Sequence, residues 1–150
     1  SSWKESALSD HERPLNKRGR KAAPKIARAL AGRGWVPEVV ISSDSVRTRE
    51  TWARMEPELE GEILVVWLSE LYCGMPVDIR EALTKLPDDV ETVMALGHNP
   101  GWEYAVEQFS GVHVRMTTAN AALLEGDCAW AELSASGDWG FIEVLRPKEL

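Results

Sequence analysis

Short apolar runs alternate along this chain with segments of helical periodicity, and this alternation most constrains how the chain can fold. Apolar, mostly β-branched runs at Val39–Ile41, Ile63–Trp67 and Val93–Leu96 have the pattern of buried strands. Residues 16–31, which Asn16 can cap, and residues 79–86 carry apolar side chains at helical spacing. Strands that alternate with helices favour a sheet covered by helices on both faces.

The remaining segments extend this pattern. Helices are expected at 45–55 and 101–109, whereas residues 1–15 have no clear period and are expected to form an irregular arm. Pro24 is expected to shorten or bend the helix in which it lies. Short strands separated by Gly-Asp turns are expected at 121–124, 129–133 and 141–145. The pattern predicts one domain over residues 1–150, built as a three-layer α/β/α sandwich.

Composition excludes several classes of function. The 150 residues suit one domain with a sizeable core, and the net charge of -7 argues against nucleic acid as the main partner. No apolar segment approaches the ~20 residues that span a bilayer, so no membrane contact is expected. The polar amino end is not expected to act as a signal peptide. Cys73 and Cys128 have neither disulfide-framework nor metal-ligand spacing, so reduced thiols and a cytoplasmic location are expected.

Two strand ends carry the candidate site. His98 lies in the turn Gly97–Gly101 that follows one apolar run, and Arg47 opens the helix that follows Val39–Ser43. Ligands of open α/β folds bind at the carboxyl edge of the strands, where helix amino ends favour anions. If the two strands are parallel neighbours, Arg47 and His98 lie at the same edge. A guanidinium beside an imidazole is suited to binding a phosphoryl group.

Each of these residues also has an ordinary structural explanation. A lone histidine in a turn is often structural, and Arg47 could be an exposed helix residue, as its neighbour Arg49 could be. Glu70 follows the Ile63–Trp67 run and could act as a general acid, although a glutamate in a loop more often serves solubility.

Other polar side chains are expected to be structural or exposed. Thr51 lies one turn after Arg47 and is expected to pack the helix, while His11 and His113 are interpreted as surface residues. The sequence contains no glycine-rich phosphate loop, dinucleotide fingerprint or Gly-x-Ser-x-Gly elbow. Because His98 has no close metal-ligating partner in sequence, we expect neither a metal nor another cofactor.

Three segments, in order, resemble the histidine phosphatase superfamily, and in particular its small SixA-type branch. They are Leu8–Gly19, Ser42–Thr51 and Gly97–Gly101, and the closing Leu145–Leu150 is also similar. The resemblance implies a phosphoglycerate mutase-like fold with a mainly parallel sheet. It also implies a metal-independent phosphatase that forms a phosphohistidine intermediate. The implied substrates are a phosphohistidine-bearing protein or a small phosphomonoester.

The resemblance assigns roles to individual residues. Arg47 matches the second phosphate-binding arginine of the family, and His98 matches the second pocket histidine, which binds the phosphoryl group. Glu70 lies roughly where larger members carry the proton donor, and Asn99 is assigned to substrate binding beside His98. The family's nucleophile is a histidine in an Arg-His-Gly or Arg-His-Ala motif at the end of the first strand. Neither tripeptide occurs in these 150 residues.

The chain is therefore expected to begin just after its own first strand. That strand is central in the fold, so without it the core should open and two neighbouring strands should lack a partner. Outer-pocket residues are expected from Trp102, 116–120 and 13–18. Three interpretations follow: a phosphatase completed by an upstream strand, a non-catalytic phosphate-binding module, or a general interaction domain in which His98 caps a turn. The sequence does not predict the oligomeric state.

Overall fold

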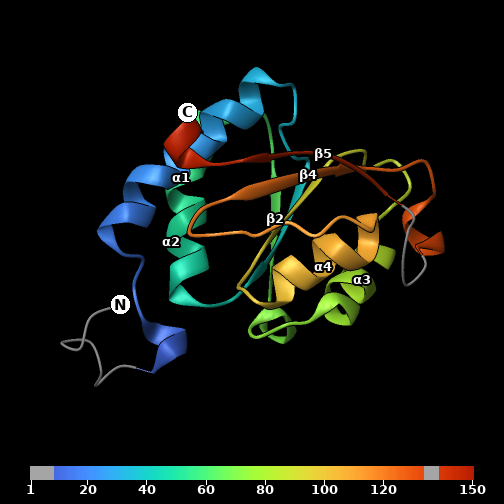
Figure 1. The fold of residues 1–150 in the computed structure, drawn as a ribbon, viewed down its shortest axis with the longest axis horizontal. Helices are drawn as coiled ribbons and strands as arrows, with labels where there is room; N and C mark the ends of the chain where they lie inside the picture. The colour runs from blue at the N-terminus through green and yellow to red at the C-terminus, as the bar shows by residue number, and fades with distance from the viewer. Residues whose placement is uncertain (1–8, 134–138) are drawn as a thin grey trace.

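A parallel sheet forms the centre of the molecule. The structure is a computed structural model and describes residues 9–133 and 139–150. Within these residues, three parallel strands in the order β2-β1-β3 form one sheet and an antiparallel pair forms a second (Figure 1). The strands are β1 (Val39–Ser43), β2 (Leu64–Leu68), β3 (Val93–Leu96), β4 (Ala121–Glu125) and β5 (Gly140–Leu145).

The helices begin and end close to the predicted bounds. They are α1 (Lys17–Gly32), α2 (Val46–Met55), α3 (Pro76–Thr84) and α4 (Gly101–Ser110). Asn16 caps α1 by accepting a hydrogen bond from the Gly19 amide at 2.8 Å. Pro24 lies inside α1, which continues to Gly32, so the expected shortening of this helix is wrong.

One other expectation about local structure fails. Residues 129–133 do not form a strand but a short 3-10 turn, Trp130–Glu132. The Trp130 indole donates a hydrogen bond to the Val90 carbonyl at 2.7 Å, which fastens this segment to the body of the protein through a side chain. Over its described residues 9–15 the arm is irregular, as expected, apart from a 3-10 turn at Asp10–Glu12, and its residues 1–8 lie outside the described part of the chain.

Successive residues of each strand face two separate apolar layers, because strand side chains alternate between faces. Val40 packs into the layer formed with α1 and α2, whereas Val39 and Ile41 pack into the layer formed with α3 and α4. Leu123 and Leu124 of β4 divide between the same two layers. The two sheets therefore lie in one plane between two helical layers, and the predicted three-layer α/β/α arrangement is confirmed.

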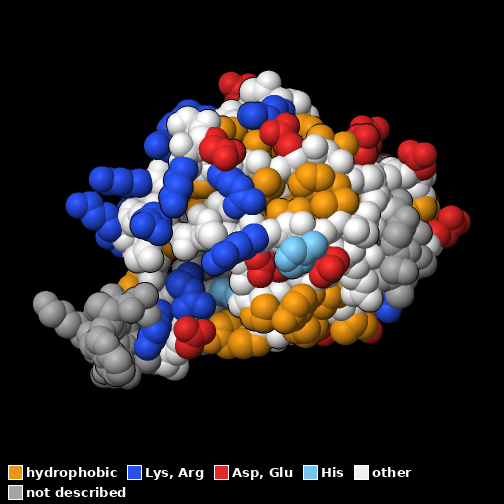
Figure 2. All heavy atoms as spheres, in the orientation of Figure 1, with side chains coloured by type: hydrophobic (Ala, Val, Ile, Leu, Met, Phe, Trp, Pro, Cys, Tyr) orange, Lys and Arg blue, Asp and Glu red, His pale blue; other side chains and the backbone are white. Residues whose placement is uncertain are grey.

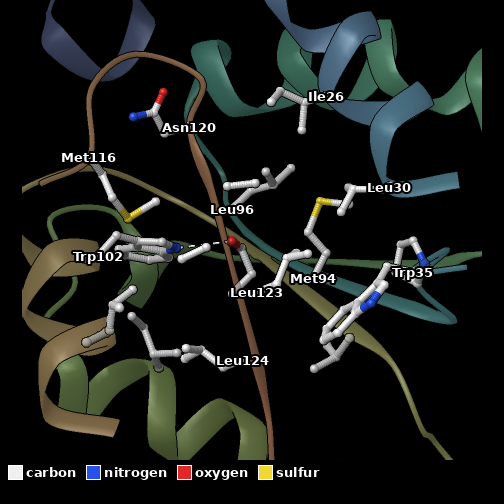
Figure 3. Close-up of a pocket in the computed structure, with 18 of the residues that line it drawn as sticks. Ile26, Leu30, Trp35, Met94, Leu96, Trp102, Met116, Asn120, Leu123 and Leu124 are labelled. Carbon is white, nitrogen blue, oxygen red and sulfur yellow. Dashed lines mark hydrogen bonds between the residues drawn. The ribbon is translucent and has the colours of Figure 1, made fainter. Parts of the chain in front are cut away.

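An apolar cavity of about 220 Å³ lies between β3 and β4 (Figure 3). Among the described residues β3 pairs with β1 alone and β4 with β5 alone, so the facing edges of β3 and β4 have no strand partner. The expected opening of the core between two unpaired strands is confirmed.

Candidate functional site

Arg47 and His98 meet at the carboxyl edge of the parallel sheet. Arg47 lies in the first turn of α2, which follows β1, and His98 lies in the turn that follows β3. Because β1 and β3 are parallel neighbours with Ser42 opposite Leu96, both turns emerge at the same edge. Arg47 Nη2 lies 3.4 Å from His98 Nδ1. The prediction that these two side chains converge is confirmed.

Both nitrogens of the His98 ring have partners. Nε2 lies 3.0 Å from Ser43 Oγ and 3.3 Å from Ser45 Oγ. Arginine nitrogens can only donate, so Nδ1 accepts from Arg47 and the proton of the neutral ring resides on Nε2, which donates to a serine hydroxyl. Burial, followed by the charge of Arg47, lowers the pKa of His98 below its ordinary value of 6.5. The ring is therefore neutral at pH 7.

Buried hydroxyl groups hold the His98 ring in place. Ser45 caps α2, because its Oγ accepts a hydrogen bond from the Thr48 amide at 3.3 Å. Thr48 Oγ1 in turn donates to the Ser43 carbonyl at 2.6 Å. Ser43 and Ser45 are fully buried, and buried hydroxyls are costly unless they are bonded. The network thus fixes the serine oxygens that orient His98. The capping role of Ser45 is visible in the sequence, but its contact with His98 is not.

The guanidinium fork of Arg47 already holds a carboxylate. Nη1 donates to Asp10 Oδ1 at 3.1 Å, and Nη2 donates to Asp10 Oδ2 at 3.3 Å. The Tyr72 hydroxyl also donates to Asp10 Oδ2. The hydrogen bonds from Arg47 and then Tyr72 lower the pKa of Asp10 to about 2, and the bond to Asp10 raises the pKa of Tyr72 to about 12. The geometry shows that the Arg47 fork can bind two oxygens of one anion.

His11 belongs to the same cluster while its side chain stays 39% exposed, in keeping with its interpretation as a surface residue. His11 Nε2 lies 2.7 Å from Asp44 Oδ1, and this hydrogen bond lowers the pKa of Asp44. The His11 and His98 rings both contact Tyr72 edge to face, with centroids 4.9 and 5.4 Å from the Tyr72 ring. His113, by contrast, is 73% exposed, as expected.

The structure does not bring Glu70 or Asn99 into hydrogen bonding with the Arg47–His98 pair. Glu70 is exposed in a short turn after β2, where it accepts a hydrogen bond from Ser69 Oγ at 3.5 Å. The Asn99 side chain donates to the Met116 carbonyl at 2.7 Å. The proton-donor role of Glu70 and the substrate contact of Asn99 therefore remain predictions. Thr51 donates to the Arg47 carbonyl at 2.8 Å, in keeping with its structural interpretation.

Close packing explains both glycines of the turn that carries His98. A Cβ on Gly97 would lie 2.1 Å from the Trp102 ring, and a Cβ on Gly101 would lie 1.9 Å from the Gly74 carbonyl oxygen. The Trp102 indole also donates to the Ala95 carbonyl of β3 at 3.1 Å. Trp102, expected to shape the outer pocket, lines the cavity between β3 and β4 (Figure 3).

The surroundings of the site carry an uneven charge. Lys and Arg side chains gather over α1 and α2, beside the edge that carries Arg47 (Figure 2).

Over the described residues, no group of three or more His, Cys, Asp or Glu side chains is placed to hold a metal ion. Among those residues, no helix is both long and apolar enough to cross a membrane.

Comparison with known proteins is consistent with this geometry. Residues 2–128 match the sequence model of the histidine phosphatase superfamily (branch 1). An uncharacterized chloroplastic protein of Arabidopsis thaliana is 36% identical over 160 aligned residues, which cover 98% of this chain and 73% of that protein.

Solved structures of similar proteins share the fold. The protein histidine phosphatase SixA in complex with tungstate has a TM-score of 0.81 and 25% identity, covering 95% of this chain and 89% of that one. A structure assigned as the phosphohistidine phosphatase SixA of Nakamurella multipartitia has a TM-score of 0.81 and 26% identity, with coverage of 93% and 88%. The fold is thus phosphoglycerate mutase-like, as these SixA structures are. The family match includes both Arg47 and His98, and the chain belongs to the histidine phosphatase superfamily.

Proposed function

We propose that Arg47 and His98 form the phosphate-binding part of a phosphatase. The substrate is a phosphohistidine on a protein or a small phosphomonoester, and the reaction passes through a phosphohistidine intermediate. The observation that carries the proposal is the convergence of Arg47 Nη2 and His98 Nδ1, 3.4 Å apart, at the carboxyl edge of a parallel sheet. Family membership and the likeness to SixA structures support it.

The two side chains supply complementary contacts to a phosphoryl group. The Arg47 fork binds two oxygens, as it binds those of Asp10 in this structure. A phosphoryl oxygen on Nη2 would also lie within reach of His98 Nδ1. The negative charge of that oxygen favours a protonated ring, and Nδ1 then becomes a donor. Because Ser43 and Ser45 fix Nε2, the ring keeps its orientation when it gains this proton.

Phosphoryl transfer needs a nucleophile besides these two residues. In the proposed reaction the histidine of an Arg-His-Gly or Arg-His-Ala motif attacks phosphorus. The bond from phosphorus to the leaving group breaks, and the leaving group takes up a proton, which we propose that Glu70 supplies. Water then attacks the phosphohistidine and gives a proton to the Glu70 carboxylate left by the first step, the phosphorus–nitrogen bond breaks and inorganic phosphate leaves. Arg47 and His98 stabilise the charge on the equatorial oxygens in both steps.

Hydrolysis of a generic aryl phosphate tests the proposal. The protein would carry an apolar strand ending in Arg-His-Gly ahead of residue 1 and would be assayed without added metal. Removing one donor of this kind typically costs about 100-fold or more in turnover, so Arg47→Ala and His98→Ala should each lower activity by that factor. Arg49→Ala is the matched control, because Arg49 lies over the Trp67 ring at 4.6 Å instead. Activity that disappears with a chelator, or survives the double substitution of Arg47 and His98, would overturn the proposal.

A second candidate is a phosphate-binding module without catalysis. The observation in its favour is that neither Arg-His-Gly nor Arg-His-Ala occurs in the 150 residues. Such a module would be stabilised against heat by phosphate or vanadate and would show no turnover in the same assay. The two candidates therefore differ in activity and agree in anion binding.

A further inference from the structure

We propose that exposed basic side chains of α1 form a docking surface for the acidic surface of a phosphohistidine-bearing protein. This α1 basic face consists of Lys17, Arg18, Lys21 and Lys25, all of which are exposed. It holds the acidic protein beside the site, so that the phosphohistidine of that protein enters it. The inference rests on the proposed function, because it chooses between the two substrate classes named there.

The charge of α1 is opposite to that of the whole chain. The helix contains six Lys or Arg residues and no Asp or Glu, whereas the 150 residues together carry a net charge of -7. Lys and Arg side chains gather on this side of the molecule (Figure 2). A surface that serves solubility alone mixes charges of both signs. A surface of one sign, on a chain of the opposite net charge, is suited to attract an anionic partner.

The basic side chains lie where they destabilise the helix. Lys21 lies one turn after Lys17 and one turn before Lys25, and like charges at this spacing repel each other. Lys17 and Arg18 occupy the first turn, where the helix dipole favours acidic side chains, and that turn contains none. The stability of the helix therefore does not account for this pattern, whereas a role in binding does.

The four side chains keep their charges available for a partner. Among residues 9–133 and 139–150, none of the four forms an ion pair with an acidic side chain. Two other arginines of the same helix differ in this respect. Arg28 pairs with Glu58 at 2.9 Å, and Arg20 donates a hydrogen bond to the Leu15 carbonyl at 2.6 Å. These two are engaged within the chain and are not part of the α1 basic face.

The α1 basic face begins beside the site. Asp10, a few residues before α1, contacts Arg47 at the carboxyl edge of the sheet. The Leu15 amide donates to Glu50 of α2 at 3.2 Å, one helical turn after Arg47, and this bond fastens the start of α1 to α2. The two helices lie side by side (Figure 1). A protein that contacts the first turns of α1 therefore reaches the edge that carries the site.

The extent of the α1 basic face favours a protein over a small phosphomonoester. At 1.5 Å per residue, Lys17 and Lys25 lie about 12 Å apart along the helix axis. A small phosphomonoester bound at Arg47 does not extend along such a surface. A folded protein does, and acidic side chains around its phosphohistidine would match the basic side chains in charge.

A membrane and a nucleic acid fit this surface less well. Helices that lie on membranes insert large apolar side chains, whereas Ile26 and Leu30, the large apolar residues of α1, are buried in the core. Nucleic acid is a long polyanion that extends well beyond one helix, and the net charge of -7 repels it.

Peptide binding by the 150-residue chain tests the docking surface. The probe is a fluorescent peptide in which six alternating Glu and Asp residues flank a histidine on each side, with the histidine phosphorylated by phosphoramidate. The control peptide has Gln and Asn in place of Glu and Asp. By fluorescence anisotropy, the acidic peptide should bind at least tenfold more tightly than the control peptide. Because ions screen exposed charges, this difference should shrink as salt is raised.

Variants of α1 locate the binding. Lys17→Glu, Lys21→Glu and Lys25→Glu together should weaken binding of the acidic peptide about tenfold or more, because exposed ion pairs are weak singly and add up over several. Binding of the control peptide should not weaken. Lys21→Glu alone is matched by Lys85→Glu, which changes an exposed lysine at the end of α3 in the other helical layer and should have no effect.

The triple variant should fold, because glutamate suits the first turn of a helix, and circular dichroism checks this. Glutamine at the same three positions repeats the test without adding negative charge, and it decides the matter if the glutamate variant does not fold.

The outcomes separate this proposal from the proposed function. Tungstate affinity that does not respond to Arg47→Ala contradicts the phosphate pocket itself. A normal tungstate response, together with an acidic peptide that binds the triple variant like the wild type, overturns the docking surface alone. Vesicles containing phosphatidylglycerol, or a DNA duplex, that bind the wild-type chain more tightly than the acidic peptide does would also overturn it.

Discussion

Gly101→Ala should destabilise the protein through a single added methyl group. Gly101 is the first residue of α4, and the added Cβ would lie 1.9 Å from the Gly74 carbonyl oxygen. To restore an ordinary contact, the two backbone segments must separate by about 1.5 Å. Overpacking costs about 1–3 kcal/mol, and the upper end applies because no side-chain rotation relieves a contact between two backbones. For about 150 residues, 3 kcal/mol corresponds to a Tm lower by roughly 6–12 °C.

The same substitution should also shift the position of His98 in the site. The Trp102 amide of α4 donates to the His98 carbonyl at 3.2 Å, so a displaced α4 moves the turn that holds His98. Gly32→Ala is the control, because no atom lies within 4 Å of a Cβ at this last residue of α1. It should leave Tm unchanged or raise stability by up to about 1 kcal/mol. Thermal unfolding followed by circular dichroism measures the Tm of both variants. A Gly101→Ala variant with wild-type Tm would refute the reasoning.

Three further predictions concern the network around the site. Ser45→Ala should lower the free energy of unfolding in urea by about 1 kcal/mol, since it removes a helix cap, while Ser69→Ala at an exposed turn should not. The Asp10–Arg47 contact depresses the pKa of Asp10 to about 2. The contribution of this contact to the free energy of unfolding is therefore complete above about pH 4 and is lost as pH falls toward 2. Because Asp10 is 56% exposed, about 1 kcal/mol is expected, and Asp10→Asn should remove this part of the acid dependence of unfolding. Since His98 is neutral at pH 7, tungstate binding should take up a proton there. Calorimetry in two buffers of different ionisation enthalpy measures that uptake, and a value of zero contradicts it.

Local signals in the sequence predict most of the fold. Asn16 marks a helix start because capping depends on residues close in sequence, and its cap forms as expected. Ser45 opens the next predicted helix and caps it in the structure. The strands follow from apolar runs bounded by turns. The prediction of a strand at 129–133 fails because the conformation of this segment depends on a distant contact, the hydrogen bond from the Trp130 indole to the Val90 carbonyl. No periodicity within five residues encodes such a contact.

The residues of the site also differ in whether local sequence signals predict them. Arg47 and His98 could be predicted together because each follows a strand, and parallel strands share an edge. Asp10 and Tyr72 were missed because their contacts span 37 and 62 residues of sequence. The segment around Asp10 belongs to the motif that resembles the family, but its role as a partner of Arg47 needed the three-dimensional arrangement. Tyr72 has no comparable signal in the sequence.

Tungstate titration of the 150-residue chain by calorimetry most directly tests whether Arg47 and His98 form a phosphate pocket. Hydrogen bonds to charged groups contribute about 1.5–3 kcal/mol, and 1.4 kcal/mol corresponds to a factor of ten in Kd. One tungstate should bind per chain, and Arg47→Ala and His98→Ala should each weaken binding at least tenfold. Arg49→Ala, which alters the same helix away from His98, should bind like the wild type. Tungstate affinity unchanged by the Arg47 and His98 substitutions would contradict the assignment of the site.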